Sequence, residues 1–193
     1  MESFNSYKEG LDLAFLKRRC VEHGRLVQFA RGDLFEKAGC PSRLVGYVVK
    51  GCFKYNVQVG GGKNFVTGFA FEGEFVADYP NCLYGRRSEV SIEANMPCEV
   101  YVIDGRDLLQ MYLGDDEAHQ QGRLIAENLF TQTYSRFLDH YRYDARERYE
   151  RLLARCPLIV QQLSLRDIAS FLNVTPKTIS QIRRDITFEV NDG

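Results

Sequence analysis

The order of apolar and polar residues divides the chain into a β-like first part and a helical second part. Between Gly24 and Asp104, short runs alternate apolar and polar residues and are separated by glycines, as in half-buried antiparallel strands. The triplet Gly60-Gly61-Gly62 is typical of a hairpin turn. Strands are predicted at 26–29, 44–49, 52–59, 64–71, 89–94 and 99–103. Strands of this length, with no helix-sized segment between them, predict a β-sandwich or jelly roll.

Helical patterns flank this β-like region on both sides. One helix is predicted within residues 1–22, and Asp104 is placed to cap a short helix that ends near Leu113. A long helix then begins at Gly114, with acidic residues at its positive end, and continues to about Tyr141. This helix would have ~27 residues and would be roughly 40 Å long. A further amphipathic helix is expected from 143 to 155.

The long helix carries an apolar stripe whose aromatic members are spaced by four, three and four residues, as in a heptad repeat. The stripe fits either a helix lying on its own β-domain or a seam between two copies of the chain. The length of the helix exceeds that of so small a domain, which favours the seam. The dimer interface is expected at Ile125, Leu129, Phe130, Tyr134, Phe137 and Tyr141.

The most specific pattern lies near the C-terminus, at residues 165–184. Apolar residues there are spaced so that two short helices share one buried seam, and a small residue stands where the helices must approach closely. The seam residues are Ile168, Leu172, Val174, Ile179 and Ile182, and the small residue is Ala169. This arrangement predicts a helix-turn-helix, whose second helix lies in the DNA major groove. The alternative is an ordinary αα-hairpin that packs on a core.

Start and turn signals support the helix-turn-helix. Ser164 and Asp167 have the spacing of a capping box, and Thr175 followed by Pro176 is an N-cap with proline at the first helical position. Asn173 falls in the turn, where a left-handed backbone conformation is needed. Both helices therefore have a defined start, and the turn has a residue suited to it.

The second helix has a face that could read DNA. Because Ile179, Ile182 and Ile186 form its buried side, Lys177, Gln181 and Arg184 fall on the opposite face at ~100° per residue. A glutamine suits the N6/N7 edge of adenine, a lysine or arginine suits guanine or phosphate, and short hydroxyl side chains suit phosphate oxygens. Any one of these could instead be a solvent-exposed helix residue. The predicted DNA-binding residues are Lys177, Gln181, Arg184, Thr175, Thr178, Ser180 and Arg183.

Charge is distributed unevenly, which the overall net charge of −1 conceals. Residues 142–186 hold nine basic and five acidic side chains, whereas residues 1–141 hold 16 basic and 19 acidic ones. A basic end joined to a weakly acidic remainder fits a DNA-reading unit attached to a domain with another task.

Length and composition set the class of protein. A chain of 193 residues can hold one large or two small domains. We expect a β-roll sensor domain at 1–113, a long dimerisation helix at 114–142 and a helix-turn-helix domain at 143–193. With no apolar run near the ~20 residues of a membrane span and no secretory signal, a cytoplasmic location without membrane contact is expected. The six cysteines are scattered, which favours free thiols over disulfides or a metal cluster.

The order of these parts resembles the Crp/Fnr family, the cyclic-AMP receptor protein and fumarate-nitrate regulator family of bacterial transcriptional regulators. The β-roll residues that carry the resemblance are Gly32-Asp33-Leu34-Phe35, Gly46–Gly51, Phe71–Phe75 and Ala94–Val100. Glu147-Arg148-Tyr149, Pro157 and Ile168–Arg184 resemble the branch found in the Bacteroides group. The resemblance implies an α+β protein with a jelly-roll β-roll similar to cyclic-nucleotide-binding domains, a homodimer on double-stranded DNA, and RNA polymerase as a partner. The DNA-binding end would be winged-helix-like, but the nine residues after Arg184 leave little room for a wing.

The family binds its effector in the β-roll, beside the long helix. Members that bind cyclic AMP hold its phosphate with a Gly-Glu-Leu segment and an Arg-Ser or Arg-Thr pair, and here Ser88-Glu89 replaces that pair. A glutamate beside a phosphate is unfavourable in a partly desolvated pocket, so cyclic AMP is not expected to be the effector. Arg86 and Arg87 could supply the charge or could be solvated loop residues. The ligand-binding candidates are Gly73, Glu74, Arg86, Arg87, Ser88, Glu89, Phe130 and Tyr134.

Two other functions compete with a regulator. A cupin-type metalloenzyme would need histidines that converge in the barrel, but His23, His119 and His140 are far apart along the chain. We therefore predict no catalytic residues, no metal ligands and no enzyme activity. Iron–sulfur sensing would need clustered N-terminal cysteines, and the three histidines give no clear axial haem ligand. We therefore expect no resident cofactor other than a small-molecule effector. The second competitor is a ligand-binding or protein-interaction jelly roll whose helix-turn-helix no longer functions.

Overall fold

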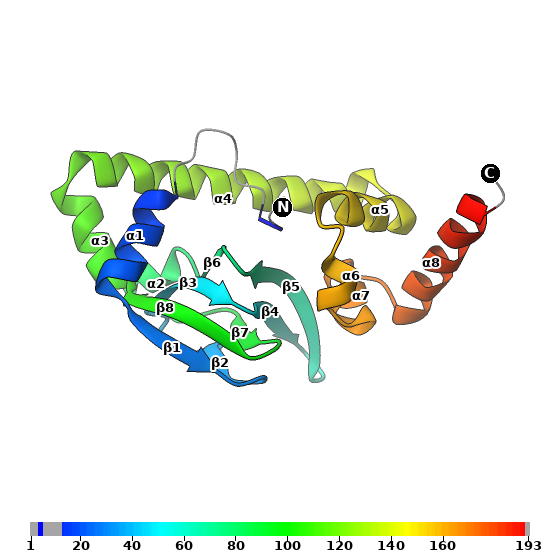
Figure 1. The fold of residues 1–193 in the computed structure, drawn as a ribbon, viewed down its shortest axis with the longest axis horizontal. Helices are drawn as coiled ribbons and strands as arrows, with labels where there is room; N and C mark the ends of the chain where they lie inside the picture. The colour runs from blue at the N-terminus through cyan, green and yellow to red at the C-terminus, as the bar shows by residue number, and fades with distance from the viewer. Residues whose placement is uncertain (1–3, 6–12, 192–193) are drawn as a thin grey trace.

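The computed structural model describes residues 4–5 and 13–191, and its β-strands form a roll of two antiparallel sheets (Figure 1). One sheet has the strand order β1-β8-β3-β6 and the other β2-β7-β4-β5. The strands are β1 Arg25–Phe29, β2 Leu34–Glu36, β3 Leu44–Lys50, β4 Cys52–Val59, β5 Lys63–Phe71, β6 Phe75–Ala77, β7 Ser91–Ala94 and β8 Cys98–Asp104. The predicted β-roll, long helix and C-terminal helices are all present, so the predicted fold class is confirmed.

Side chains from both sheets form the core of the roll. Val48, Phe53 and Val100 are completely buried between the sheets. Gly51 joins β3 to β4 with a φ of 97°, and a Cβ atom there would lie only 2.6 Å from the Sγ atom of Cys98. Glycine is therefore required at this turn for both its backbone conformation and its size.

The helix α4, Asp116–Arg142, runs along one side of the molecule, and the β-roll lies beneath it (Figure 1). The Asp115 side chain caps it by accepting a 2.7 Å hydrogen bond from the Ala118 N–H. Its first half packs against α3, Gly105–Gly114, where Gly122 lies against the Tyr112 ring. The smaller helix α1, Ala14–His23, packs beside β3 and β8. The short helix α2, Asn81–Tyr84, packs beside α3.

The apolar stripe predicted on α4 separates into two faces. Ile125 is buried, and Leu129 packs against the same cluster, which also contains Leu108 and Tyr112 of α3. Both residues therefore pack within the chain, and their place in a dimer interface stays a prediction. The aromatic members of the stripe point into solvent instead.

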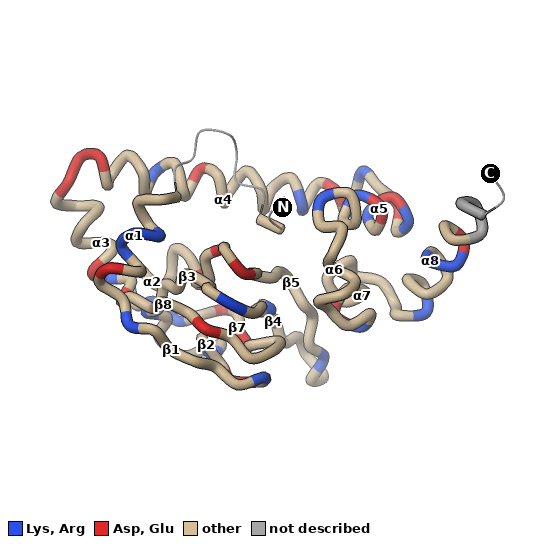
Figure 2. The backbone as a smooth tube through the Cα atoms, viewed as in Figure 1, with Lys and Arg blue, Asp and Glu red and all other residues tan. Residues whose placement is uncertain are grey.

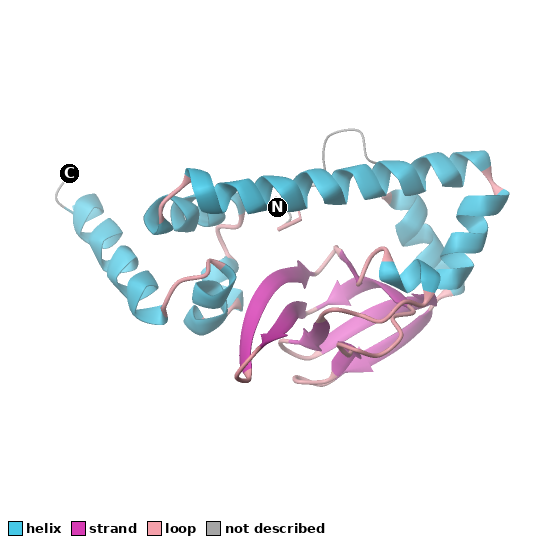
Figure 3. Ribbon diagram, turned by 180° about the vertical axis from the view of Figure 1, so that it is seen from behind, coloured by secondary structure: helices cyan, strands magenta, loops and turns pink. Residues whose placement is uncertain are grey.

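Four helices follow α4 in the chain. The last of them, α8, extends away from the rest of the molecule when seen from behind (Figure 3). They are α5 Ala145–Arg155, α6 Ile159–Gln162, α7 Leu165–Phe171 and α8 Pro176–Asn191. Their apolar cluster includes Val66 and Phe69 of β5 and the ring of Phe4. The C-terminal helices therefore share a core with the edge of a β-sheet, which the sequence pattern did not indicate.

Candidate nucleic-acid interface

The helices α7 and α8 begin with the caps that the sequence predicts. The Ser164 hydroxyl oxygen accepts a 3.1 Å hydrogen bond from the Asp167 N–H and donates its proton to the Asp167 carboxylate at 2.6 Å. The Thr175 hydroxyl oxygen accepts a 3.1 Å hydrogen bond from the Thr178 N–H. Asn173, in the turn, has a φ of 54°, in the left-handed region. These local choices define where each helix starts and how the chain turns between them.

The seam between the two helices is fully apolar. Ile168, Ala169 and Ile179 are each at most 1% exposed, and Leu172 and Ile182 are also buried. The Ala169 carbonyl accepts a 2.9 Å hydrogen bond from the Val174 N–H, which closes the turn between the two helices. The buried ring of Tyr149, on α5, belongs to the same cluster. The predicted seam therefore forms, and α8 packs on α7 with one face outward.

The outward face of α8 contains the three side chains predicted to read bases. Lys177, Gln181 and Arg184 are all exposed. The side-chain amide of Gln181 donates a 2.8 Å hydrogen bond to the carboxylate of Asp185, one turn further on. This bond orients the amide and places an acidic group beside the face, which the sequence pattern did not indicate.

The remaining predicted contacts lie near the start of α8 or on its flank. The hydroxyl oxygens of Thr175 and Thr178 are 2.8 Å apart, and the Ser180 hydroxyl donates a 3.0 Å hydrogen bond to the Pro176 carbonyl. Arg183 is exposed, and its charge opposes the rise that burial causes in the pKa of Tyr149. Lysine and arginine positions recur along α5 and α8 (Figure 2). The structure thus brings all seven predicted DNA-binding residues onto one helix or its cap.

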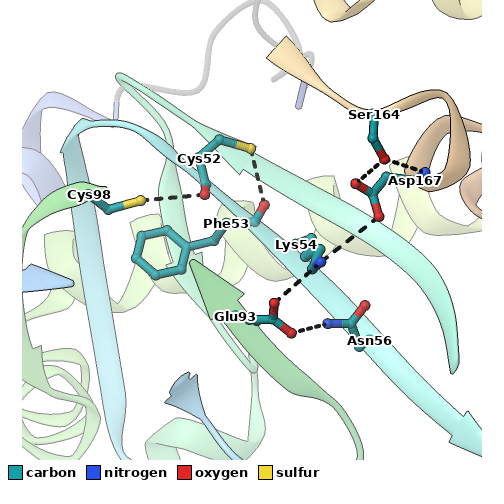
Figure 4. Close-up of polar contacts among 8 residues, drawn as sticks. All are labelled: Cys52, Phe53, Lys54, Asn56, Glu93, Cys98, Ser164 and Asp167. Carbon is teal, nitrogen blue, oxygen red and sulfur yellow. Dashed lines mark hydrogen bonds and ion pairs between the residues drawn. The ribbon is translucent and has the colours of Figure 1, made fainter. Parts of the chain in front are cut away.

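Polar contacts fasten α7 to the β-roll. The Lys54 ammonium lies 3.3 Å from a carboxylate oxygen of Glu93, on β7, and 3.9 Å from one of Asp167, on α7 (Figure 4). Asp167 therefore has two roles, since it also completes the cap with Ser164. Sequence reasoning identified the cap but not the ion pair, because Lys54 is more than a hundred residues away in the sequence.

Glu74, a predicted ligand residue, already has its hydrogen-bonding capacity engaged. Its carboxylate accepts hydrogen bonds from the backbone N–H of Asn5 at 2.7 Å, the side-chain amide of Asn5 at 2.8 Å and the N–H of Phe71 at 3.0 Å. Burial raises the pKa of Glu74, and these hydrogen bonds oppose the rise. Gly73 beside it is exposed in a turn with a φ of 85°.

The other ligand candidates do not converge on a common point. Arg86 lies over the exposed ring of Tyr84, with its guanidinium carbon 4.8 Å from the ring centroid, and Arg87 donates to the carbonyl of Gly39. The Ser88 hydroxyl donates to the Val90 carbonyl at 2.7 Å, while Glu89 is exposed. These contacts do not form a clamp for a cyclic-nucleotide phosphate, so the residues present do not fit that group. Two further candidates lie exposed on α4, namely Phe130 and Tyr134.

Metal-binding clusters and membrane spans are both absent from the described part of the chain. There, no three His, Cys, Asp or Glu side chains gather closely enough to hold a metal ion. None of the helices in the described ranges is both long and apolar enough to cross a membrane.

Comparison with known proteins places this geometry in context. The family model described as "Cyclic nucleotide-binding domain" matches residues 26–115, and no curated protein matches the chain. Among solved structures, FixK2 from Bradyrhizobium japonicum is similar with a TM-score of 0.76 and 17% identity over 86% of this chain and 85% of that one. CooA from Carboxydothermus hydrogenoformans gives a TM-score of 0.71 and 14% identity over 96% and 88% of the two chains.

A transcriptional regulator of the CRP/FNR family from Thermus thermophilus is also similar, with a TM-score of 0.63 and 15% identity over 86% of this chain and 87% of that one. Identities this low establish a shared fold, and the Bacteroides-type branch stays a prediction. Residues 26–115 therefore match the model of cyclic nucleotide-binding domains, and over most of its length the chain has the fold of the Crp/Fnr regulators.

Proposed function

We propose that this protein is a sequence-specific DNA-binding transcriptional regulator that acts as a homodimer on a pseudo-palindromic operator. The observation that carries the proposal is the packing of α8 on α7, which leaves Lys177, Gln181 and Arg184 together on an exposed face. A helix held in this way can enter the major groove while its buried face remains packed on α7. The described residues offer no metal cluster, and the proposal assigns no catalytic role to the chain.

The exposed aromatic stripe of α4 supports a dimer. Phe130 is 70% exposed, Tyr141 is 76% exposed, and Tyr134 and Phe137 are each about half exposed. Neighbouring rings along the stripe lie 5.8, 6.4 and 5.1 Å apart between centroids, so they form one continuous apolar surface. A second copy of α4 would bury this surface. Two-fold symmetry would then present two recognition helices about 34 Å apart, one helical turn of DNA.

In this proposal residues 1–113 act as a sensor domain, 114–142 as the dimerisation helix and 143–193 as the DNA-binding domain. The proposed effector is a small molecule other than cyclic AMP. Two observations support this: Asn5 engages Glu74, and Arg86 and Arg87 form no phosphate clamp. A change in the β-roll would shift the conformational equilibrium of the protein between two positions of the DNA-binding helices. RNA polymerase is the proposed protein partner.

Selection of bound sites from a random DNA pool tests the proposal. We expect the selection to recover a sequence with two related half-sites. The protein should bind the selected site far more tightly than a scrambled site at the same salt concentration. Equal affinity for selected and scrambled DNA at every salt concentration would contradict sequence-specific regulation. That result would instead favour a ligand-binding module whose helix-turn-helix no longer functions.

A further inference from the structure

A cleft of about 1190 Å³ opens where β5, α4, α5 and α7 meet. Its lining comes from residues 65–67 of β5, 133–141 of α4 and 148–155 of α5, and from 170–173 at the end of α7. Clefts that bind small molecules typically measure roughly 300–1,000 Å³, so this one is large enough for such a ligand. The cleft is distinct from the β-roll positions described above, since none of those candidates lines it.

The cleft is rich in positive charge. Four arginines line it, Arg136 from α4 and three from α5, against a single carboxylate, that of Asp139. The three arginines of α5 are Arg148, Arg151 and Arg155, and none of them forms an ion pair with any residue that the structure describes. Because arginines are charged at all physiological pH values, this concentration of charge favours an anion.

Aromatic rings hold three of the guanidinium groups in place. Those of Arg136 and Arg155 lie over the ring of Phe4, at 4.8 and 5.1 Å from its centroid, and that of Arg151 lies 4.1 Å from the centroid of the Tyr143 ring. A guanidinium that stacks through its face keeps the N–H groups of its edge available for a carboxylate or phosphate. These ring contacts position the arginines in advance of ligand binding.

Two donors among these arginines are buried without a partner. The Nε atoms of Arg148 and Arg155 are inaccessible to solvent and have no hydrogen-bond acceptor among the described residues. Buried donors are almost always satisfied in folded proteins. Burial also lowers the pKa of Arg155, while the charges of Asp139 and Glu74 oppose this shift and that of Arg151 adds to it. A bound anion would offset the cost of burying this charge and bring acceptors to the arginine edges.

We propose that this cleft is a binding site for a small anionic ligand whose carboxylate or phosphate is held by Arg148, Arg151 and Arg155. The half-buried rings of Phe65 and Phe171, which also line the cleft, accommodate an apolar or planar body. Arginine forks bind both oxygen-rich groups in the same bidentate way, so the shared chemistry is an oxyanion on an apolar frame.

The position of the cleft gives the ligand a consequence that rests on the proposed DNA-binding function. The walls come from the sheet edge, the long helix and α7, so a ligand that contacts all three favours one placement of α7 and α8 over others. Binding would then change the affinity for the operator, and operator binding would change ligand affinity by the same factor.

Calorimetric titration of the full chain without DNA tests the site. The probes are phenyl phosphate, benzoate and the neutral benzyl alcohol. We expect saturable binding of at least one anion, and binding of benzyl alcohol at least about tenfold weaker, because charge-assisted hydrogen bonds are lost. Tighter binding of phenyl phosphate indicates a phosphate-bearing ligand and tighter binding of benzoate a carboxylate, and either result supports the site.

Variants identify the cleft as the place of binding. Arg151→Gln and Arg155→Gln should each lower the affinity for the anion at least about tenfold. Arg166→Gln, at an exposed position outside the cleft, should leave that affinity unchanged. Arg151 is exposed, so its variant is expected to fold even where Arg155→Gln does not, and circular dichroism checks this. Absence of saturable anion binding, equal affinity for benzyl alcohol, or unchanged affinity in both variants would overturn the proposal. Because no DNA is present, such a failure leaves the proposed DNA-binding function standing.

Discussion

The hydroxyl oxygen of Ser170, near the end of α7, accepts a 2.9 Å hydrogen bond from the backbone N–H of Val66 on β5. β5 is an edge strand of its sheet, so its outer N–H groups have no strand partner. Ser170 thus satisfies a donor at the sheet edge, and Phe171 beside it packs 5.5 Å from the ring of Phe69 between centroids. The first helix of the DNA-reading unit is therefore also the cover of a sheet edge.

Ser170→Ala should destabilise the protein. It removes the acceptor for the partly buried Val66 N–H, and a lost hydrogen bond of this kind costs about 1 kcal/mol. Urea unfolding measures the loss. Ser135→Ala, at an exposed position of α4, is the matched control because it has the same change in helix propensity. Equal stability of the two variants would show that the bond to β5 contributes nothing.

Local features of the fold could be predicted from the sequence, whereas long-range contacts could not. The left-handed turn at Asn173 and the caps at Ser164 and Thr175 depend on neighbouring residues, so their spacing alone identified them. The strands β2 and β6 escaped prediction, since each has only three residues and shows no readable alternation.

The same limit applies to the candidate site. The exposed face of α8 follows from helix geometry, and Lys177, Gln181 and Arg184 lie on it as expected, while their contact with DNA stays a prediction. The engagement of Glu74 by Asn5, 69 residues away, leaves no periodic signal in the sequence. Nor does the packing of Ile125 on α3, because an apolar stripe looks the same whether it faces its own chain or a second one.

Stability should depend on pH through Glu74. Burial raises the pKa of this carboxyl in the folded protein above its ordinary value, so the folded state binds more protons than the unfolded state between the two values. The free energy of unfolding should therefore fall as pH rises from about 4.3 through the raised pKa. Unfolding in urea across that range, for the wild type and for Glu74→Gln, measures the effect.

The free energy of unfolding of the wild type, measured relative to that of Glu74→Gln, should decrease as pH rises. The exposed Glu72→Gln controls for the loss of one negative charge two residues away. A stability difference between wild type and Glu74→Gln that stays constant or grows with pH would contradict the prediction.

Replacement of Phe130 by glutamate should convert the proposed dimer to a monomer. Its side chain is 70% exposed in the single chain, so the variant should fold, while the charge would be buried at the seam. Sedimentation velocity measures the mass, and Ser135→Glu provides a control at an exposed position on another side of the same helix. A wild type that is monomeric at all concentrations, or a Phe130→Glu variant that remains dimeric, would exclude this seam.

The thiols should differ sharply in reactivity. Cys40 is exposed, whereas burial raises the pKa values of Cys20 and Cys82 to about 12, which leaves little thiolate near neutral pH. Ellman's reagent should label Cys40 in the fast phase, and Cys40→Ser should remove that phase. Cys82→Ala should retain it, and the reverse pattern would be inconsistent with the burial of Cys82.

Gln181→Ala should relax the preference for one base pair by roughly 1–3 kcal/mol without greatly weakening binding to other sequences. The reason is that its amide, held by the Asp185 carboxylate at 2.8 Å, can present both a donor and an acceptor to a base edge. Arg183→Ala offers the contrast: a side chain that contacts phosphate should lower affinity for all sequences alike and reduce the salt dependence by about one counterion. Fluorescence anisotropy with the selected operator and its single-base variants, at several salt concentrations, separates the two effects. A uniform loss from Gln181→Ala across all variants would show that α8 does not read a base through this residue.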